Sequence, residues 1–237
     1  MKRSTFFHRI SVIVVSCIVC LTAGAQEYLY EIGGGLGSSF YMGDANKNAA
    51  FRNMNAEAGA MFRYNANFRI AFKGDLLWTR LTGTTVGQEN VYPGNAEATF
   101  DRQVIDFGGQ GEFNFFPFSD KYKFLYTKRV SPYIAGGFGL TVSPGGGATV
   151  ISPYLTAGTG VKYKLKNRIN IGAELSARKS FSDRLDIAAG NELLNSPYGI
   201  NSSPLKNKDW YIIFAVTVTY DFGLRNCNCN KKDMDKK

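Results

Sequence analysis

The stretch that decides the fold is WYIIFAVTVTYDF at residues 210–222. Every second side chain from Trp210 to Phe222 is apolar. From Ala215 onward, the residues that alternate with them are small or polar, namely Ala215, Thr217, Thr219 and Asp221. An unbroken apolar face with aromatic residues at both rims is typical of a lipid-facing strand, because ~9–11 tilted residues cross the hydrocarbon and aromatic rings settle at the interfaces. The segment therefore predicts one strand of a membrane-spanning barrel.

Seven further segments alternate in a similar way, and no stretch has convincing helical periodicity. The eight predicted strands are residues 28–40, 55–64, 68–80, 102–115, 131–142, 152–164, 168–179 and 210–222. Short Asn-containing turns at 65–67 and 165–167 alternate with longer polar connections, as in outer-membrane barrels with short periplasmic turns and longer external loops. The sequence thus predicts an all-β fold: an eight-stranded antiparallel transmembrane β-barrel of the outer-membrane type, an up-and-down meander with both termini in the periplasm.

The N-terminus has the features of a secretory signal peptide. Basic residues precede the apolar run ISVIVVSCIVCL at residues 10–21, and Ala23-Gly24-Ala25 is a small-residue cleavage site. The run is shorter than the ~20 residues that an uncleaved membrane helix needs. We therefore expect a signal peptide at 1–25, a barrel at 26–223 and a periplasmic tail at 224–237.

Signal-peptide removal restricts the chemistry of the mature chain. The net charge falls from +9 to +6, and His8, the single histidine, is lost. Ser-His-Asp and Cys-His catalytic systems and His-based zinc sites then cannot form. We expect no enzymatic activity, no cofactor and no metal.

The predicted inward faces carry charges of both signs. An eight-stranded barrel is only wide enough for its own side chains, so charges inside it must pair to offset desolvation. A packed ion network is favoured over an open channel and over a glycosidase-like carboxylate pair. Its candidate members are Glu57, Arg63, Lys73, Asp75, Asp106, Glu112, Glu174 and Arg178.

Two segments on the expected periplasmic side are candidate partner-binding sites. The connection at 116–130 is too long for a hairpin turn and interleaves aromatic residues with Lys121, Lys123, Lys128 and Arg129. It is either an anchor at the lipid headgroups or a docking loop for a periplasmic partner. The tail carries Cys227-Asn228-Cys229, which in an oxidising compartment forms an inter-chain link or a strained local disulfide, unless it is an accidental metal binder.

The chain resembles the PorG-like outer-membrane β-barrels of the type IX secretion and gliding machinery. The resemblance covers essentially the whole mature chain. It rests on the order and spacing of YEIGGGLG at 30–37, YMGD at 41–44, EFNFFPF at 112–118, SPYIAGGFG at 131–139, FSDRLD at 181–186 and CNC at 227–229. It implies a non-enzymatic membrane component that contacts a periplasmic ring of lipoprotein and partner subunits.

Three alternatives remain open from the sequence. A structural or adhesive surface barrel would bind external ligands through the connections at 81–101 and 180–209. A small-solute pore would need an open lumen, and a soluble lipocalin-like barrel would need its apolar face inside.

Overall fold

The computed structural model describes residues 28–42, 53–84, 99–120, 125–144, 149–166, 168–181 and 210–224. These residues form eight strands: β1 (Tyr28–Met42), β2 (Asn55–Asn65), β3 (Ile70–Thr84), β4 (Thr99–Asn114), β5 (Val130–Ser143), β6 (Val150–Lys166), β7 (Ile169–Ser180) and β8 (Trp210–Leu224). β8 includes Leu224, which the sequence analysis placed in the tail. The predicted strands are all present, and their ends differ by at most a few residues.

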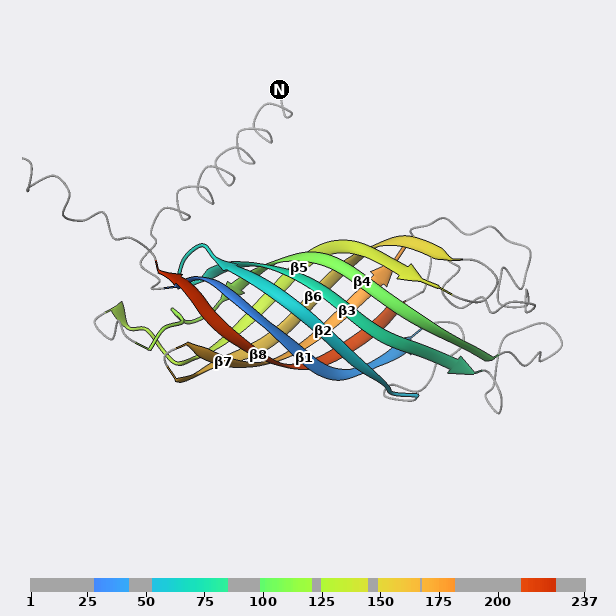
Figure 1. The fold of residues 1–237 in the computed structure, drawn as a ribbon, viewed down its shortest axis with the longest axis horizontal. Helices are drawn as coiled ribbons and strands as arrows, with labels where there is room; N and C mark the ends of the chain where they lie inside the picture. The colour runs from blue at the N-terminus through green and yellow to red at the C-terminus, as the bar shows by residue number, and fades with distance from the viewer. Residues whose placement is uncertain are drawn as a thin grey trace, which may run out of the picture.

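The strands close into a barrel in the order of the sequence (Figure 1). Every neighbouring pair is antiparallel, and β1 closes the ring against β8, with Tyr28 opposite Leu224 and Met42 opposite Trp210. We call the end with Tyr28 and Leu224 the terminus end, and the opposite end the loop end. The predicted fold class, an up-and-down barrel of the outer-membrane type, is confirmed.

The exterior of the barrel is apolar. Leu36 is 71% exposed, Phe107 68% and Phe138 73%. Along β4, for example, the residues that alternate with Phe107 are buried in the lumen. Large apolar side chains exposed around a whole surface are unfavourable in water and favourable in lipid. The soluble lipocalin-like alternative, which needs these side chains inside, is therefore wrong. Within the described ranges, no helix is long and apolar enough to span a membrane.

The β2–β3 turn corrects one prediction. The sequence analysis began a strand at Phe68, where the alternation would put its ring on the lipid face, but β3 begins at Ile70 and Phe68 is buried. Asn67 ends the hairpin, because its Oδ1 accepts hydrogen bonds from the backbone N–H groups of Arg69 (2.8 Å) and Ile70 (2.7 Å). Phe68 therefore lies in the β2–β3 turn at the terminus end of the barrel.

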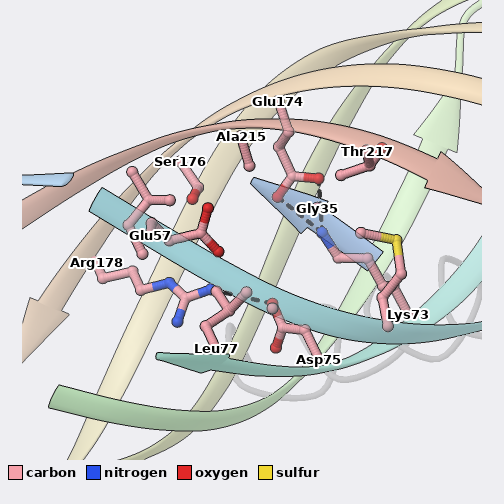
Figure 2. Close-up of a pocket in the computed structure, with 13 residues that line it drawn as sticks. Gly35, Glu57, Lys73, Asp75, Leu77, Glu174, Ser176, Arg178, Ala215 and Thr217 are labelled. Carbon is pink, nitrogen blue, oxygen red and sulfur yellow. Dashed lines mark hydrogen bonds and ion pairs between the residues drawn. The ribbon is translucent and has the colours of Figure 1, made fainter. Parts of the chain in front are cut away.

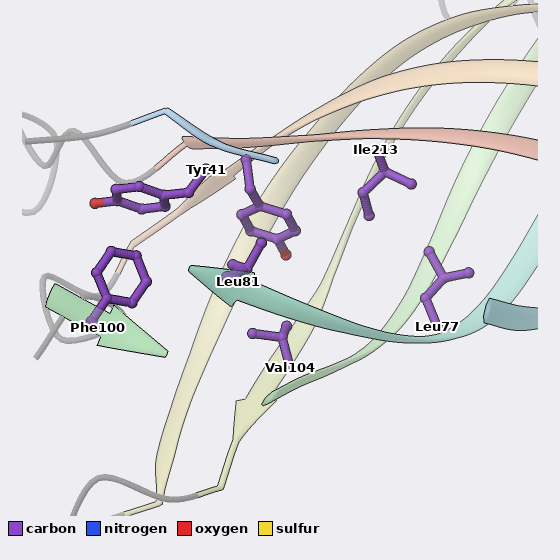
Figure 3. Packing of buried hydrophobic residues seen from close by; sticks show 7 residues of the cluster. Tyr41, Leu77, Leu81, Phe100, Val104 and Ile213 are labelled. Atoms are coloured by element: carbon purple, nitrogen blue, oxygen red, sulfur yellow. The ribbon is translucent and has the colours of Figure 1, made fainter. Parts of the chain in front are cut away.

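The loop end of the barrel is filled by apolar side chains, which the ionic interpretation of the lumen did not anticipate. The buried cluster is Tyr41, Leu77, Leu81, Phe100, Val104, Tyr211 and Ile213 (Figure 3). The Tyr41 and Phe100 rings meet edge to face with centroids 4.9 Å apart. Most of the buried charges therefore lie between this cluster and the terminus end; Arg102, between Phe100 and Val104 on β4, is an exception.

Candidate functional site

The candidate site is the charged lumen. Among the described residues, six cationic and seven carboxylate side chains are buried. The cations are Arg63, Lys73, Arg102, Lys162, Lys164 and Arg178; the carboxylates are Glu31, Glu57, Asp75, Asp106, Glu112, Glu174 and Asp221. Alternation along each strand places them inside, because inward and outward side chains follow one another with a period of two.

A terminus-end cluster consists of Glu31, Arg63, Glu112, Lys162, Lys164 and Asp221. Arg63 pairs with Glu31 and with Glu112, where Nη2 donates to Oε1 at 3.1 Å. Lys162 also pairs with Glu112, and Lys164 pairs with Asp221. Three cations thus match three carboxylates, so this cluster carries no net charge when all of its members are ionised.

A mid-barrel cluster consists of Glu57, Lys73, Asp75, Asp106, Glu174 and Arg178. Lys73 Nζ donates to both oxygens of Glu174, at 2.8 and 2.6 Å. Arg178 donates to Asp75 at 3.0 Å and to Asp106 at 2.6 Å. These pairs join β3, β4 and β7 across the lumen.

Tyrosine and threonine side chains donate further hydrogen bonds to carboxylates of the mid-barrel cluster. Tyr133 Oη donates to Glu174 at 2.6 Å, and Tyr211 Oη donates to Asp106 at 2.8 Å. Thr141 Oγ1 donates to Asp106 at 2.7 Å. The guanidinium of Arg178 lies over the Tyr154 ring, 5.0 Å from its centroid. Such contacts offset the cost of burying ions.

Glu57 differs from the other predicted members of the network. It is 2% exposed, and neither of its carboxylate oxygens has a hydrogen-bond partner among the residues that the structure describes. It lines a cavity together with Lys73, Asp75, Glu174 and Arg178 (Figure 2). The structure therefore brings seven of the eight predicted network residues into ion pairs and leaves Glu57 beside a cavity.

Some lumen residues were missed from the candidate set, although the alternation of inward and outward residues in the sequence would have identified them. Lys162 and Lys164 alternate with the outward-facing residues Val161, Tyr163 and Leu165 of β6. Extending the inward register to this strand would have found both. The tyrosines Tyr133, Tyr154 and Tyr211 have the same inward parity on their strands.

The other candidate site is the β4–β5 connection at the terminus end. Phe118 is 2% exposed, and its backbone N–H donates to the Phe68 carbonyl at 3.1 Å. Lys128 forms an isolated parallel bridge with Phe118, and its Nζ lies 4.0 Å from the Phe116 ring centroid. Arg129 is exposed beside it. Lys121, Lys123, Cys227 and Cys229 lie outside the described residues.

The arrangement supports ion pairing and packing. Within the described ranges, no group of three or more His, Cys, Asp or Glu side chains is placed to hold a metal ion. The carboxylates of the paired clusters accept from cations or hydroxyl groups, so the network holds the strands together across the lumen.

Several solved structures resemble this barrel. Neisserial surface protein A has a TM-score of 0.50 at 13% identity, covering 81% of this chain and 97% of that chain. Ail of Yersinia pestis has a TM-score of 0.46 at 14% identity, covering 83% and 100%. OprG of Pseudomonas aeruginosa has a TM-score of 0.44 at 11% identity, covering 84% and 98%. At such identities, the likeness to Neisserial surface protein A shows the fold alone.

The sequence itself matches one family. No curated protein matches the chain. A family model described as a domain of unknown function, DUF6089, matches residues 8–143 and 149–231. Because this match covers most of the chain, the protein belongs to the DUF6089 family.

Proposed function

We propose that this barrel is a non-enzymatic outer-membrane component of a protein secretion machinery of the type IX kind. In this role it anchors or positions a periplasmic ring of lipoprotein and partner subunits. The resemblance to PorG-like barrels motivates the secretion role, and the apolar exterior supports the membrane location.

The observation that carries the proposal is the folded β4–β5 connection. Phe118 fixes it to the barrel, while Tyr126 is 86% exposed and Lys128 and Arg129 are also exposed. Exposed aromatic and arginine side chains on an ordered support are favoured contacts in protein interfaces. The positive φ of Tyr126, 55°, is uncommon for a residue other than glycine and marks a constrained turn.

The filled lumen favours an anchoring role over a pore. Ion pairs cross the lumen at two levels, and apolar side chains fill its loop end. A solute would have to break several buried ion pairs to pass, at a cost of several kcal/mol for each.

The position of the strand ends supports a contact at one end of the barrel. The β4–β5 connection lies at the terminus end, and β8 also finishes there, at Leu224 (Figure 1). In the sequence, the basic tail with Cys227 and Cys229 follows Leu224 directly. With the termini in the periplasm, both segments are available to a periplasmic partner.

A charge-reversal experiment tests the docking surface. The double substitution Lys128→Glu/Arg129→Glu should abolish recovery of the periplasmic partners in a pull-down from crosslinked cells, because both side chains are exposed and neither lies in the lumen network. Arg80→Glu, an exposed cation at the loop end, is the matched control and should leave recovery unchanged. Equal recovery from all three proteins would contradict the proposal.

The tail is tested separately. Non-reducing gels of whole cells should show a larger species that disappears with reductant and in a Cys227→Ser/Cys229→Ser variant. Deleting residues 225–237 leaves β8 intact and should remove the same species. A single band at the monomer mass would exclude a covalent link and leave non-covalent docking through the β4–β5 connection.

A further inference from the structure

The mid-barrel cluster has more carboxylates than cations. Lys73 and Arg178 face four carboxylates, those of Glu57, Asp75, Asp106 and Glu174. The terminus-end cluster is balanced, so it supplies no spare positive charge. Arg102 is the remaining buried cation of the described residues and lies two inward positions beyond Asp106 toward the loop end. Even with Arg102 included, the described lumen has seven carboxylates for six cations.

The excess charge is located at Glu57. Lys73 is bonded to Glu174, and Arg178 is bonded to Asp75 and Asp106. Both oxygens of Glu57 and the Oδ1 of Asp75 are buried without a hydrogen-bond partner among the described residues. An ionised carboxylate in such surroundings is costly unless a positive charge or strong donor reaches it.

The cavity beside Glu57 has room for a small ligand. Figure 2 shows the Glu57 carboxylate among the lining side chains, with Lys73 and Arg178 held by their own partners. The space open to the centre of a water-sized sphere is about 20 Å³. This is enough for one water or one ion of similar size, since about 10–15 Å³ by this measure holds a water.

Glycines beside Glu57, on its own strand and on β1, leave room around its carboxylate. Gly37 lies opposite Glu57 on β1, and Gly59 is the next inward position on β2. A Cβ at Gly37 would lie 2.8 Å from Glu57 Oε2, and one at Gly59 would lie 3.2 Å from Oε1. Larger residues at these positions would crowd the carboxylate.

We propose that this cavity binds one small monovalent cation, with the carboxylates of Glu57 and Asp75 as its protein ligands. Both carboxylate oxygens of Glu57 and the Oδ1 of Asp75 are buried without a hydrogen-bond partner among the described residues, and both residues line the cavity. A divalent ion fits less well, because calcium takes 6–8 oxygen ligands and the described residues place no three ligating side chains together. The bound ion would neutralise the lumen charge and strengthen the barrel without taking part in partner docking.

The test uses the full-length protein in detergent micelles, with sodium chloride compared with choline chloride at equal ionic strength. For the wild type, the ²³Na resonance should broaden in the presence of protein. Above the dissociation constant, a tenfold rise in Na⁺ should raise the folding equilibrium constant about tenfold, because the ion binds only the folded barrel. Choline, which is too large for the cavity, should have no such effect.

Two variants separate the site from general salt effects. Glu57→Gln keeps the size of the side chain and removes the charge, so both sodium effects should disappear while the barrel still folds. Asp101→Asn removes an exposed carboxylate at the loop end and should keep both effects. A wild type without any sodium-specific effect would overturn the proposal and indicate that a proton or a bridging water satisfies Glu57. An unchanged sodium response in Glu57→Gln would overturn it as well.

Discussion

At the scale of single residues, the barrel depends on cations that contact two carboxylates. Arg178 is 1% exposed and links Asp75 on β3 with Asp106 on β4. Replacing it leaves two buried carboxylates without their main partner. Loss of one member of a buried ion pair typically costs about 3–5 kcal/mol.

Arg178→Met should therefore lower the free energy of unfolding by about 3–5 kcal/mol. The control is Arg80→Met. Arg80 Nε donates to Asp101 at 2.6 Å, but both side chains are exposed, and exposed pairs contribute little. Denaturant unfolding of the purified barrel in detergent would measure both. Equal losses in the two variants would contradict the proposed role of the lumen network.

Glu57 marks the limit of what the sequence predicts for single residues. Alternation along β2 places Glu57 and Arg63 inside equally well. Their environments differ because strand register fixes the depth of each side chain in the barrel, and Arg63 meets Glu31 and Glu112 while Glu57 meets a cavity. Alternation gives the face of a residue, whereas its partner depends on strands far away in the sequence.

At the scale of elements, the strands follow closely from the sequence, and the ends of the barrel do not. A period of two identifies each strand and its lipid face regardless of its neighbours. The apolar cluster at the loop end combines residues of β1, β3, β4 and β8, so no single strand reveals it. The prediction for Phe68 was wrong because it extended the alternation of β3 backward into the β2–β3 turn, which the Asn67 side chain stabilises by accepting a hydrogen bond from the Arg69 N–H group.

Two glycines on neighbouring strands should respond differently to substitution. A Cβ at the inward-facing Gly137 of β5 would lie 2.7 Å from Gln110 Cα, whereas a Cβ at the outward-facing Gly109 of β4 would meet nothing within 4 Å. Gly137→Ala should destabilise the barrel by about 1–3 kcal/mol through overpacking, with Gly109→Ala nearly neutral. The stability of each variant can be measured from the temperature at which its folded band disappears on unheated-versus-heated gels. Equal stability of the two variants would contradict the idea that close packing at Gly137 destabilises the substituted barrel.

The β4–β5 connection is held to the terminus end of the barrel by Phe118. Its ring is buried and lies 5.5 Å from Lys164 Nζ, whereas the Phe116 ring is 39% exposed. Phe118→Ala should release the β4–β5 connection, because truncating a buried Phe typically costs about 3–5 kcal/mol. Limited trypsin digestion should then cut after Lys128 and Arg129 much faster than in the wild type. Phe115→Ala, which truncates a ring that is 47% exposed, is the control, and equal acceleration in both variants would show that Phe118 does not hold the connection.

At the scale of the whole molecule, the proposed role is that of a membrane anchor whose lumen is closed to solutes. Purified barrel should give no discrete conductance steps in planar bilayers, because ion pairs and the apolar cluster fill its interior. Regular single-channel steps that persist after repeated purification would contradict this. The secretion role itself comes from the resemblance and not from the architecture, since many small barrels share this fold.

The central claim is that the terminus end contacts a periplasmic partner, and in-cell photo-crosslinking tests it most directly. A photo-reactive amino acid is placed at Tyr126, exposed at the terminus end, and in a second strain at Thr99, exposed at the loop end. We predict high-mass adducts from position 126, containing periplasmic subunits, and none from position 99. Adducts from position 99 alone would contradict the account and favour a surface barrel that binds external ligands through its loops.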